Sequence, residues 1–223
     1  MLALSWSGGK DSALALEALR EAGNEPGLLL STIDSERSVV PHHDVPVGLL
    51  RQQAELAGLP LVEIGIPAGS ANETYEERLR RAFADGPLAE VSAVAFGDLF
   101  FEDLRAYREA RLEAIGRRTT FPLWGRDTHE LAVDFVERFE ATVCAVDLEQ
   151  FPDGRPGVPY DLNFVRRLPD GVDACGENGE FHTFVHGGPV LTGTVELSCD
   201  ETVKSDDGRF LHARITDSVA REW

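Results

Sequence analysis

The residues with the clearest capacity for chemistry lie near the start of the chain, in the segment Ser7-Gly8-Gly9-Lys10-Asp11-Ser12. Glycines let a backbone close around an anion, so that successive N–H groups point into one concavity. A helix that begins directly after such a loop adds partial positive charge. The serine hydroxyls and the Lys10 ammonium are further donors, and Asp11 could cap the helix or hold Mg²⁺. The segment therefore predicts a pyrophosphate site.

The spacing of this segment differs from the GxxxxGK[ST] pattern of Walker A loops, so that class of nucleotide-binding protein is not indicated. A flexible glycine turn followed by a helix cap is the alternative interpretation. Finding six suitable residues together at a strand-to-helix junction favours the anion site.

A second candidate segment, residues 175–183, carries polar side chains between glycines: Glu177, Asn178, Glu180, His182 and Thr183. The two carboxylates could orient an amine, accept its proton or hold Mg²⁺. Solvated acids in a glycine turn are the alternative. Cys175 has no basic residue near it in sequence, so we expect a buried structural thiol rather than a nucleophile.

Other candidates follow predicted strands, where ligands of open α/β sheets bind. They are His42 and His43 after the second strand, and Glu102, Asp103, Arg105 and Arg108 at the start of a helix. For the histidines, a surface loop is an equal alternative. Glu109 and Arg111 are expected on a solvated, ion-paired face. We expect Trp124 to pack in the core rather than to stack on a ligand.

Patterning of apolar residues predicts the elements that position these side chains. The expected strands are residues 1–6, 27–33, 61–66, 91–96, 120–123 and 142–146, and the expected helices are residues 11–22, 45–57, 102–115, 128–139 and one between 70 and 86. Ser70-Ala71-Asn72-Glu73 has the spacing of a capping box for that last helix. The alternation predicts a doubly wound α/β fold with five or six parallel strands.

The pattern changes after Asp147, because prolines and glycines crowd into residues 152–159. Two strands are then expected on either side of a turn at residues 205–208. We predict two domains, a parallel-sheet domain over residues 1–147 and a smaller α+β domain over residues 148–223.

Composition narrows the function classes. The 223 residues are 43% hydrophobic and 27% charged, which is typical of a globular protein, and no apolar run approaches a membrane span. The formal net charge of -18 disfavours a nucleic-acid partner. Three cysteines without a CxxC pair predict a reducing, cytoplasmic location and no zinc site. The composition does not decide the oligomeric state, and a homodimer is one alternative.

The loop segment resembles the PP-loop branch of the adenine nucleotide alpha-hydrolase-like superfamily, whose members use ATP by releasing pyrophosphate. Residues 97–105, 122–125 and 175–183 resemble the diphthine-ammonia ligase family, also called the diphthamide synthase ATP-binding family. The resemblance covers nearly the whole chain. It implies that the first domain binds ATP, through residues that include His43, Gly97 and Asp98, and that the second carries catalytic and substrate-binding residues.

Two segments depart from the family members that make diphthamide. Those members carry Gly-Ala-Ile in place of Gly97-Asp98-Leu99, and a Cys-Gly-Glu-Gly-Gly-Glu-Tyr-Glu-Thr type of segment in place of residues 175–183. The chain resembles the bacterial-type branch, and bacteria lack diphthamide. The resemblance therefore supports the use of ATP more strongly than it supports diphthine as the substrate.

The resemblance implies an amide ligase that adenylates a carboxylate with ATP and Mg²⁺, after which ammonia or a small amine displaces AMP. In the family, the carboxylate belongs to a modified histidine of elongation factor 2. For this chain the sequence does not specify the identity of the acid. Lys10, Asp11, Glu177 and Glu180 are the expected catalytic residues, and Asp11 is the expected Mg²⁺ ligand. Glu102, Asp103, Arg105, Asn178, His182 and Thr183 are expected to bind substrate. A PP-loop tRNA-modifying enzyme and a non-catalytic ATP sensor are the alternatives.

Overall fold

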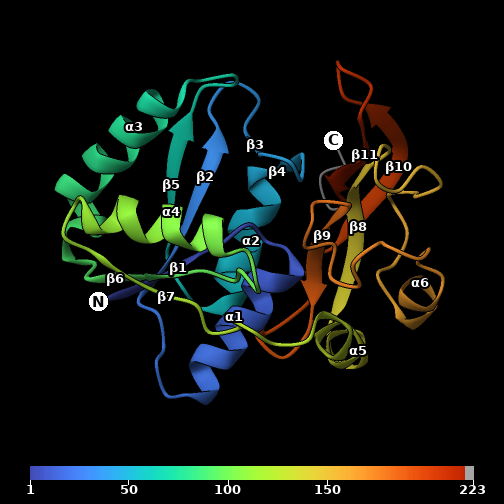
Figure 1. The fold of residues 1–223 in the computed structure, drawn as a ribbon, viewed down its shortest axis with the longest axis horizontal. Coiled ribbons are helices and arrows are strands. Elements are labelled where there is room, and N and C mark those ends of the chain that lie inside the picture. Colours follow the sequence, from blue (N-terminus) through green and yellow to red (C-terminus); the bar gives the residue numbers. More distant parts are fainter. Residues whose placement is uncertain (219–223) are drawn as a thin grey trace.

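Two sheets of different kinds organise the chain, as the computed structural model of residues 1–218 shows (Figure 1). The elements of the first part are β1 (Leu2–Ser5), α1 (Lys10–Glu21), β2 (Leu28–Asp34), β3 (Val39–Val40), β4 (Val45–Pro46), α2 (Val47–Ala57), β5 (Leu61–Ile66), α3 (Asn72–Ala84), the 3₁₀ helix η1 (Gly86–Glu90), β6 (Ala93–Ala95), α4 (Glu102–Glu113) and β7 (Arg118–Thr120). Those of the second part are α5 (Thr128–Arg138), β8 (Glu140–Asp147), α6 (Leu162–Arg166), β9 (Phe181–Gly187), β10 (Leu197–Lys204) and β11 (Phe210–Asp217). No helix among residues 1–218 combines the length and the apolar character needed to cross a membrane.

The first sheet is mostly parallel and has seven strands within the described residues. Its parallel strands lie in the order β5-β2-β1-β6-β7, and β3 and β4 add a short antiparallel extension beside the end of β2. Alternate residues of each strand face opposite sides: Leu4 packs with α1 and α2, whereas Ala3 packs with Phe83 of α3 and Leu112 of α4. Helices therefore cover both faces, which confirms the predicted doubly wound fold.

The order of the strands creates a crevice at one edge of this sheet. From β1 the chain moves outward through α1 to β2 and through α2 to β5, and it then returns through α3 to β6 on the other side of β1. Chain connections thus diverge between β1 and β6. In open α/β sheets, ligands bind outside the carboxyl ends of the strands at such a point.

The second sheet is antiparallel, in the order β10-β11-β8-β9. Here one expectation is wrong: residues 142–146 form part of β8, which pairs with β9 and β11 instead of extending the parallel sheet. The expected turn at residues 205–208 does join β10 and β11. Sequence patterning missed β9, and its first residues belong to the segment expected to be a glycine-punctuated loop.

Several expected ends of elements also differ. Residues 70–73 do not form a capping box, because Ala71 is the N-cap of α3 and the Ser70 hydroxyl donates to the Pro67 carbonyl (2.6 Å). The strand expected at 120–123 lies earlier, as β7. Val45 and Pro46, expected in a helix, pair with β3.

Two hydrophobic clusters connect the two sheets, and in them α1 and α2 pack toward β8 and β9. Gln53 of α2 is fully buried at this junction. Its Oε1 accepts from the Trp6 indole N–H (3.0 Å), and its Nε2 donates to the carbonyls of Gly8 (3.0 Å) and Val185. One amide therefore joins the end of β1, the glycine loop and β9.

We expect Gln53→Leu to lower the free energy of unfolding by about 3 kcal/mol, because each buried polar partner left unpaired costs roughly 1–3 kcal/mol. Urea unfolding would measure this loss. The control is Arg51→Gln on the same helix, which removes an exposed ion pair with Glu63 and should change stability by less than about 1 kcal/mol. Equal stability of Gln53→Leu and the wild-type protein would contradict the linking role of the amide.

Candidate active site

The glycine loop lies between β1 and α1, at the junction of the two sheets. Gly8 has a φ of 79°, a conformation that favours glycine. A Cβ at Gly9 would come within 3.0 Å of the Thr183 carbonyl and 3.1 Å of His43 Nε2. Both glycines are therefore required, the first by its backbone conformation and the second by the close approach of β9 and His43.

The N-terminus of α1 is arranged to receive an anion. Its N-cap, Gly9, has no side chain, so no N-cap side chain accepts from the free N–H groups of the first turn. The N–H of Lys10 donates to the Thr183 hydroxyl (3.0 Å). Ser12 is buried, and its hydroxyl donates to the Gly9 carbonyl (2.8 Å), so it fixes the loop rather than pointing to a ligand. Ser7 Oγ accepts from the Gly9 N–H (3.3 Å).

Lys10 places one positive charge beside this helix end. Its side chain is 4% exposed, and Nζ lies 2.7 and 2.8 Å from the two carboxylate oxygens of Asp11. Burial alone would lower the pKa of Lys10, but the Asp11 carboxylate and weaker attraction from Cys175 and Glu177 raise it overall. Lys10 is therefore a permanent cation.

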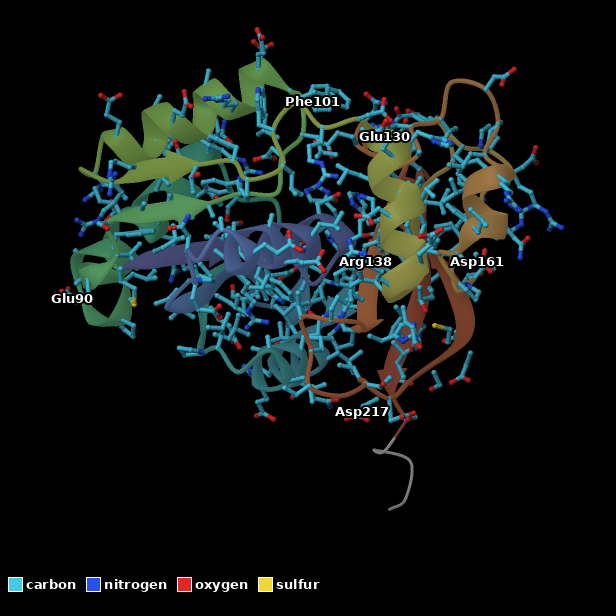
Figure 2. The ribbon with its side chains drawn as sticks, turned by 90° about the horizontal axis from the view of Figure 1, so that it is seen from below. Glu90, Phe101, Glu130, Arg138, Asp161 and Asp217 are labelled. Atoms are coloured by element: carbon cyan, nitrogen blue, oxygen red, sulfur yellow. The ribbon has the colours of Figure 1, made fainter. Side chains whose placement is uncertain are left out.

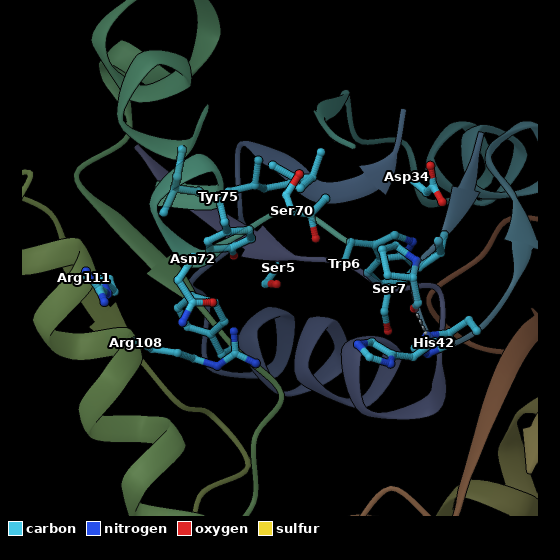
Figure 3. Close-up of a pocket in the computed structure, with 18 of the residues that line it drawn as sticks. Ser5, Trp6, Ser7, Asp34, His42, Ser70, Asn72, Tyr75, Arg108 and Arg111 are labelled. Carbon is cyan, nitrogen blue, oxygen red and sulfur yellow. Dashed lines mark hydrogen bonds between the residues drawn. The ribbon is translucent and has the colours of Figure 1, made fainter. Parts of the chain in front are cut away.

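A large cavity of about 740 Å³ lies over strands β2, β1 and β6 of the parallel sheet, beside helices α3 and α4. Figure 3 shows Arg108 and Arg111 of α4 on one side of this cavity, with Ser7 and His42 on the other. Cavities of roughly 300–1,000 Å³ typically enclose a drug-sized molecule. The size and position of this one suit a nucleotide whose phosphates reach the loop at Ser7.

A smaller pocket of about 150 Å³ lies on the far side of the loop. Its lining comes from α1, the loop before α4, and the segment that leads into β9: Gly9, Lys10, Asp11, His43, Asp98, Phe101, Leu104, Cys175, Gly176, Glu177, Gly179, Phe181, His182 and Thr183. His43 borders both cavities. The glycine loop, residues 7–12, is called the phosphate loop from here on because its sequence predicts an anion site. It thus forms the wall between the nucleotide-sized cavity and the small polar pocket.

Close packing brings the β6–α4 loop to this wall. A Cβ at Gly97 would lie 2.8 Å from the Asp11 carbonyl, so glycine is needed for the loop to touch α1. The next residue, Asp98, lines the small pocket and is held by Arg108, with Oδ2 2.7 Å from Nε. Gly97 therefore allows the close approach of the loop to α1, and Asp98 contributes a carboxylate to the small pocket.

Glu177 joins the two halves of the site, because its Oε1 accepts from the backbone N–H of Leu99 (3.0 Å). Burial, together with the nearby Asp11 carboxylate, raises the pKa of Glu177 to about 7; the Leu99 N–H and Lys10 oppose this only in part. A carboxyl that titrates near neutrality can hold and release a proton during a reaction.

The histidines of the pocket are neutral near pH 7. Burial lowers the pKa of His43 to about 4, and its Nδ1 lies 3.2 Å from the Pro41 carbonyl, which leaves Nε2 as the acceptor beside Gly9. Burial also lowers the pKa of His182, whose ring centroid is 4.7 Å from that of His43. The two rings supply polar atoms without adding charge.

Several predicted site residues lie elsewhere. Glu180 is buried outside both cavities, where its Oε1 accepts from the Asp173 N–H and the Asn178 amide (2.8 Å each) and shapes the turn. Glu102 and Asp103 are exposed on the first turn of α4. Arg105 pairs with Glu109 (2.8 Å), and its guanidinium lies 4.7 Å from the ring of Trp124, which is half-buried beside Phe121 and outside the buried core.

Other residues reach the large cavity without having been singled out as ligands. Tyr75 lies at helical spacing with Leu79 and Phe83 along α3, and all three residues line the cavity. Arg111 pairs with Glu76 (2.5 Å) as an ion-paired face predicts, yet it also borders the cavity. Helical spacing shows which face a residue occupies, but whether that face meets a core or a cavity depends on neighbouring elements.

The buried thiol of Cys175 fits the expected structural role. Its Sγ donates to the Thr128 carbonyl (3.2 Å), and burial raises its pKa to about 12, although Lys10 acts in the opposite sense. The thiolate is therefore a minor species near neutral pH.

The residues present fit Mg²⁺ bound together with phosphate. Within residues 1–218, no cluster of three or more His, Cys, Asp or Glu side chains is placed to hold a metal alone. Mg²⁺ is usually held by one or two carboxylates plus substrate phosphates. Asp11 and Asp98 line the pocket beside the loop and are the carboxylates that would hold it.

Comparison with known proteins gives a family for both parts of the chain. Residues 1–121 match the family described as "Diphthamide synthase N-terminal domain", and residues 127–217 match "Diphthamide synthase C-terminal domain". No match was found among curated proteins. A similar solved structure is "The crystal structure of predicted subunit of tRNA methyltransferase from Methanocaldococcus jannaschii DSM", with 16% identity, a TM-score of 0.45, and coverage of 84% of this chain and 97% of that one.

The raised pKa of Glu177 predicts a dependence of stability on pH. Folding raises this pKa from 4.5 to about 7, so the folded state holds a proton that the unfolded chain releases. This contribution to stability is complete below the unfolded pKa and is lost as the pH rises through the folded pKa. We therefore expect the wild-type free energy of unfolding, relative to that of Glu177→Gln, to fall between about pH 4.5 and about pH 7 and to level off above.

Urea unfolding of both proteins across that range would measure the difference. The control is Glu130→Gln, at an exposed position of α5, which should follow the wild-type pH dependence. Parallel curves for Glu177→Gln and wild type would show that the Glu177 carboxyl titrates normally.

Proposed function

Because the chain belongs to the diphthamide synthase family, we propose that it is an ATP-dependent ligase that joins a carboxylic acid to ammonia or a small amine. The family places it among the PP-loop enzymes that use ATP. The amide-forming step and the identity of the acid go beyond what the family match establishes for this chain.

The position of the phosphate loop carries this proposal. Ser7 faces the large cavity, whereas Gly9, Lys10 and Asp11 face the small pocket. A nucleotide in the large cavity would present its phosphates to the N-terminus of α1 and its α-phosphorus to the small pocket. A carboxylate in that pocket would then be close to the atom that it must attack, and such proximity is a large part of catalysis.

In the first step, an oxygen of the acid attacks the α-phosphorus of ATP, and the bond to the leaving pyrophosphate breaks. Lys10 and the first-turn N–H groups of α1 stabilise the charge that develops on pyrophosphate. Asp11 and Asp98 line the pocket beside the loop and would hold Mg²⁺, which when bound would supply further charge neutralisation.

In the second step, the amine nitrogen attacks the acyl carbon, the bond to AMP breaks, and the nitrogen loses a proton. Glu177 is the group that we assign to accept this proton, because its pKa lies near 7 and it lines the small pocket. Glu180 positions the turn around Asp173 and Asn178. The division of labour thus places ATP activation on α1 and amine activation on the segment before β9.

We expect ATP with Mg²⁺ to protect the protein against heat denaturation, and NAD or GTP to protect it much less. At about 100 times the dissociation constant, the gain in free energy would be roughly 2.7 kcal/mol. Differential scanning fluorimetry with each nucleotide would measure it. An unchanged melting temperature in millimolar ATP would contradict the nucleotide site.

We expect Lys10→Ala to lower the rate of pyrophosphate release by about a hundredfold to a thousandfold, because one preorganised charged donor is lost. The sequence offers a matched control, since its other lysine, Lys204, lies exposed on β10. Lys204→Ala should keep full activity. Full activity of Lys10→Ala would exclude it as the group that stabilises pyrophosphate.

Glu177→Gln should bind ATP with wild-type affinity but form product at least about a hundredfold more slowly, since loss of a general base costs about that much. Glu180→Gln should instead lower the melting temperature with less effect on turnover. Isothermal titration and a coupled pyrophosphate assay separate these effects. A loss of ATP affinity in Glu177→Gln would identify Glu177 as a nucleotide ligand. If the protein bound ATP but released no pyrophosphate from it with any acid tested, a non-catalytic ATP sensor would be favoured.

A further inference from the structure

Exposed apolar side chains gather at one place, the start of α4. The described residues include seven large hydrophobic side chains that are exposed, and four of them fall within eight residues: Phe100, Phe101, Leu104 and Tyr107. We refer to these four residues as the α4 rim. The rings of Phe100 and Phe101 lie 4.7 Å apart, so they form a continuous surface. A concentration of exposed apolar groups of this kind marks a binding surface.

The α4 rim borders the candidate active site. Phe101 and Leu104 line the small pocket, and Tyr107 lines the large cavity. Figure 2 shows Phe101 at the edge of the molecule, beyond the end of α4 and toward the C-terminal half. A molecule that reaches Lys10 or Glu177 from this side therefore passes over apolar side chains.

The size of the small pocket limits what it can enclose. Its volume of about 150 Å³ is below the roughly 300–1,000 Å³ of pockets that bury a whole small ligand. It can take the reacting carboxylate and the amine, while the rest of the acid must remain outside. Phe101 and Leu104 are the side chains at that exit.

Charge restricts the acid further. Among the described residues that line the small pocket, Lys10 is the permanent cation, and it already faces Asp11. Asp98, which Arg108 holds, and Glu177 add carboxyl groups inside the pocket. Along the rim Glu102 and Asp103 are exposed, and the basic residue of this stretch, Arg105, is already paired with Glu109. A second carboxylate on the substrate would meet acids there, so the site suits an acid with one negative charge.

The rim is too small to be a protein interface by itself. A stable protein complex buries about 800 Å² and roughly 20–30 residues on each partner. Four side chains, each between 37% and 41% exposed, provide a small part of that area. They are enough to cover the apolar part of a small acid.

We propose that the acid substrate is a small monocarboxylic acid with an aliphatic or aromatic body, which lies on the α4 rim while its carboxylate enters the small pocket. The inference rests on the proposed ligase function. The rim then sets specificity, because apolar area removed from water on binding adds to the affinity for longer acids.

The test uses the full chain with ATP, Mg²⁺ and saturating ammonium, and compares acetate, butyrate, hexanoate and phenylacetate with the dicarboxylate adipate. We expect kcat/KM for pyrophosphate release to rise roughly fourfold for each added methylene, as expected for burial of that group. Adipate should be at least about tenfold poorer than hexanoate, because like charges are juxtaposed. Leu104→Ser and Phe101→Ser should flatten the chain-length series without changing ATP affinity.

The matched control is Val203→Ser on β10, which removes an apolar side chain of similar exposure outside the site. It should preserve the whole series. Equal kcat/KM for acetate and hexanoate, or a preference for adipate, would overturn the inference while leaving the ligase function intact. Turnover only with a carboxylate on a folded protein would also overturn it.

Equilibrium binding of hexanoate and adipate in the presence of α,β-methylene-ATP separates the two proposals. This measurement needs no turnover. Preferential binding of hexanoate that is lost in Leu104→Ser would support the rim, whatever the turnover assay with ATP shows. If that assay then showed no pyrophosphate release, the ligase chemistry alone would be refuted. Absence of binding by every monocarboxylate would refute the rim.

Discussion

The site depends on the attachment of the phosphate loop to β9. The Gly8 carbonyl accepts from the Val185 N–H (2.9 Å) and from Gln53 Nε2 (3.0 Å), and the Lys10 N–H donates to Thr183 (3.0 Å). An isolated glycine loop would have many conformations, and fixing them costs free energy. Hydrogen bonds from a strand of the other sheet hold the loop in one shape before any ligand binds, so the ordering cost is met during folding.

This attachment explains why the reactive groups have unusual properties. With β9 against the loop, the preceding segment lies over α1, and Glu177 is brought to the Leu99 N–H. Glu177 thereby loses much of its solvent and approaches Asp11, and its pKa rises to about 7. The same burial keeps His43 and His182 neutral, so the pocket combines one fixed cation, two neutral rings and one carboxyl, that of Glu177, which can exchange a proton.

The division into two cavities follows from the same geometry. The large cavity is lined entirely by residues of the parallel-sheet part, between residues 5 and 112. The small polar pocket requires the second sheet, because Cys175, Glu177 and Thr183 line it. The α4 rim is the remaining boundary and the part that faces outward. In the proposed ligase, the nucleotide, the reacting atoms and the body of the acid would therefore occupy three different parts of the fold.

The sequence by itself determined the local features: the strand, glycine loop and helix around residues 7–12, the alternation of strands and helices, and the polar segment 175–183. These follow from backbone preferences and from apolar spacing within a few residues. The placement of β8 in the second sheet, of Tyr75 and Arg111 at the cavity, and of Glu180 outside it was decided by tertiary structure. The reason is physical: strand partners, burial and pKa values depend on residues distant in sequence, and local spacing carries no information about which distant surface a side chain will meet.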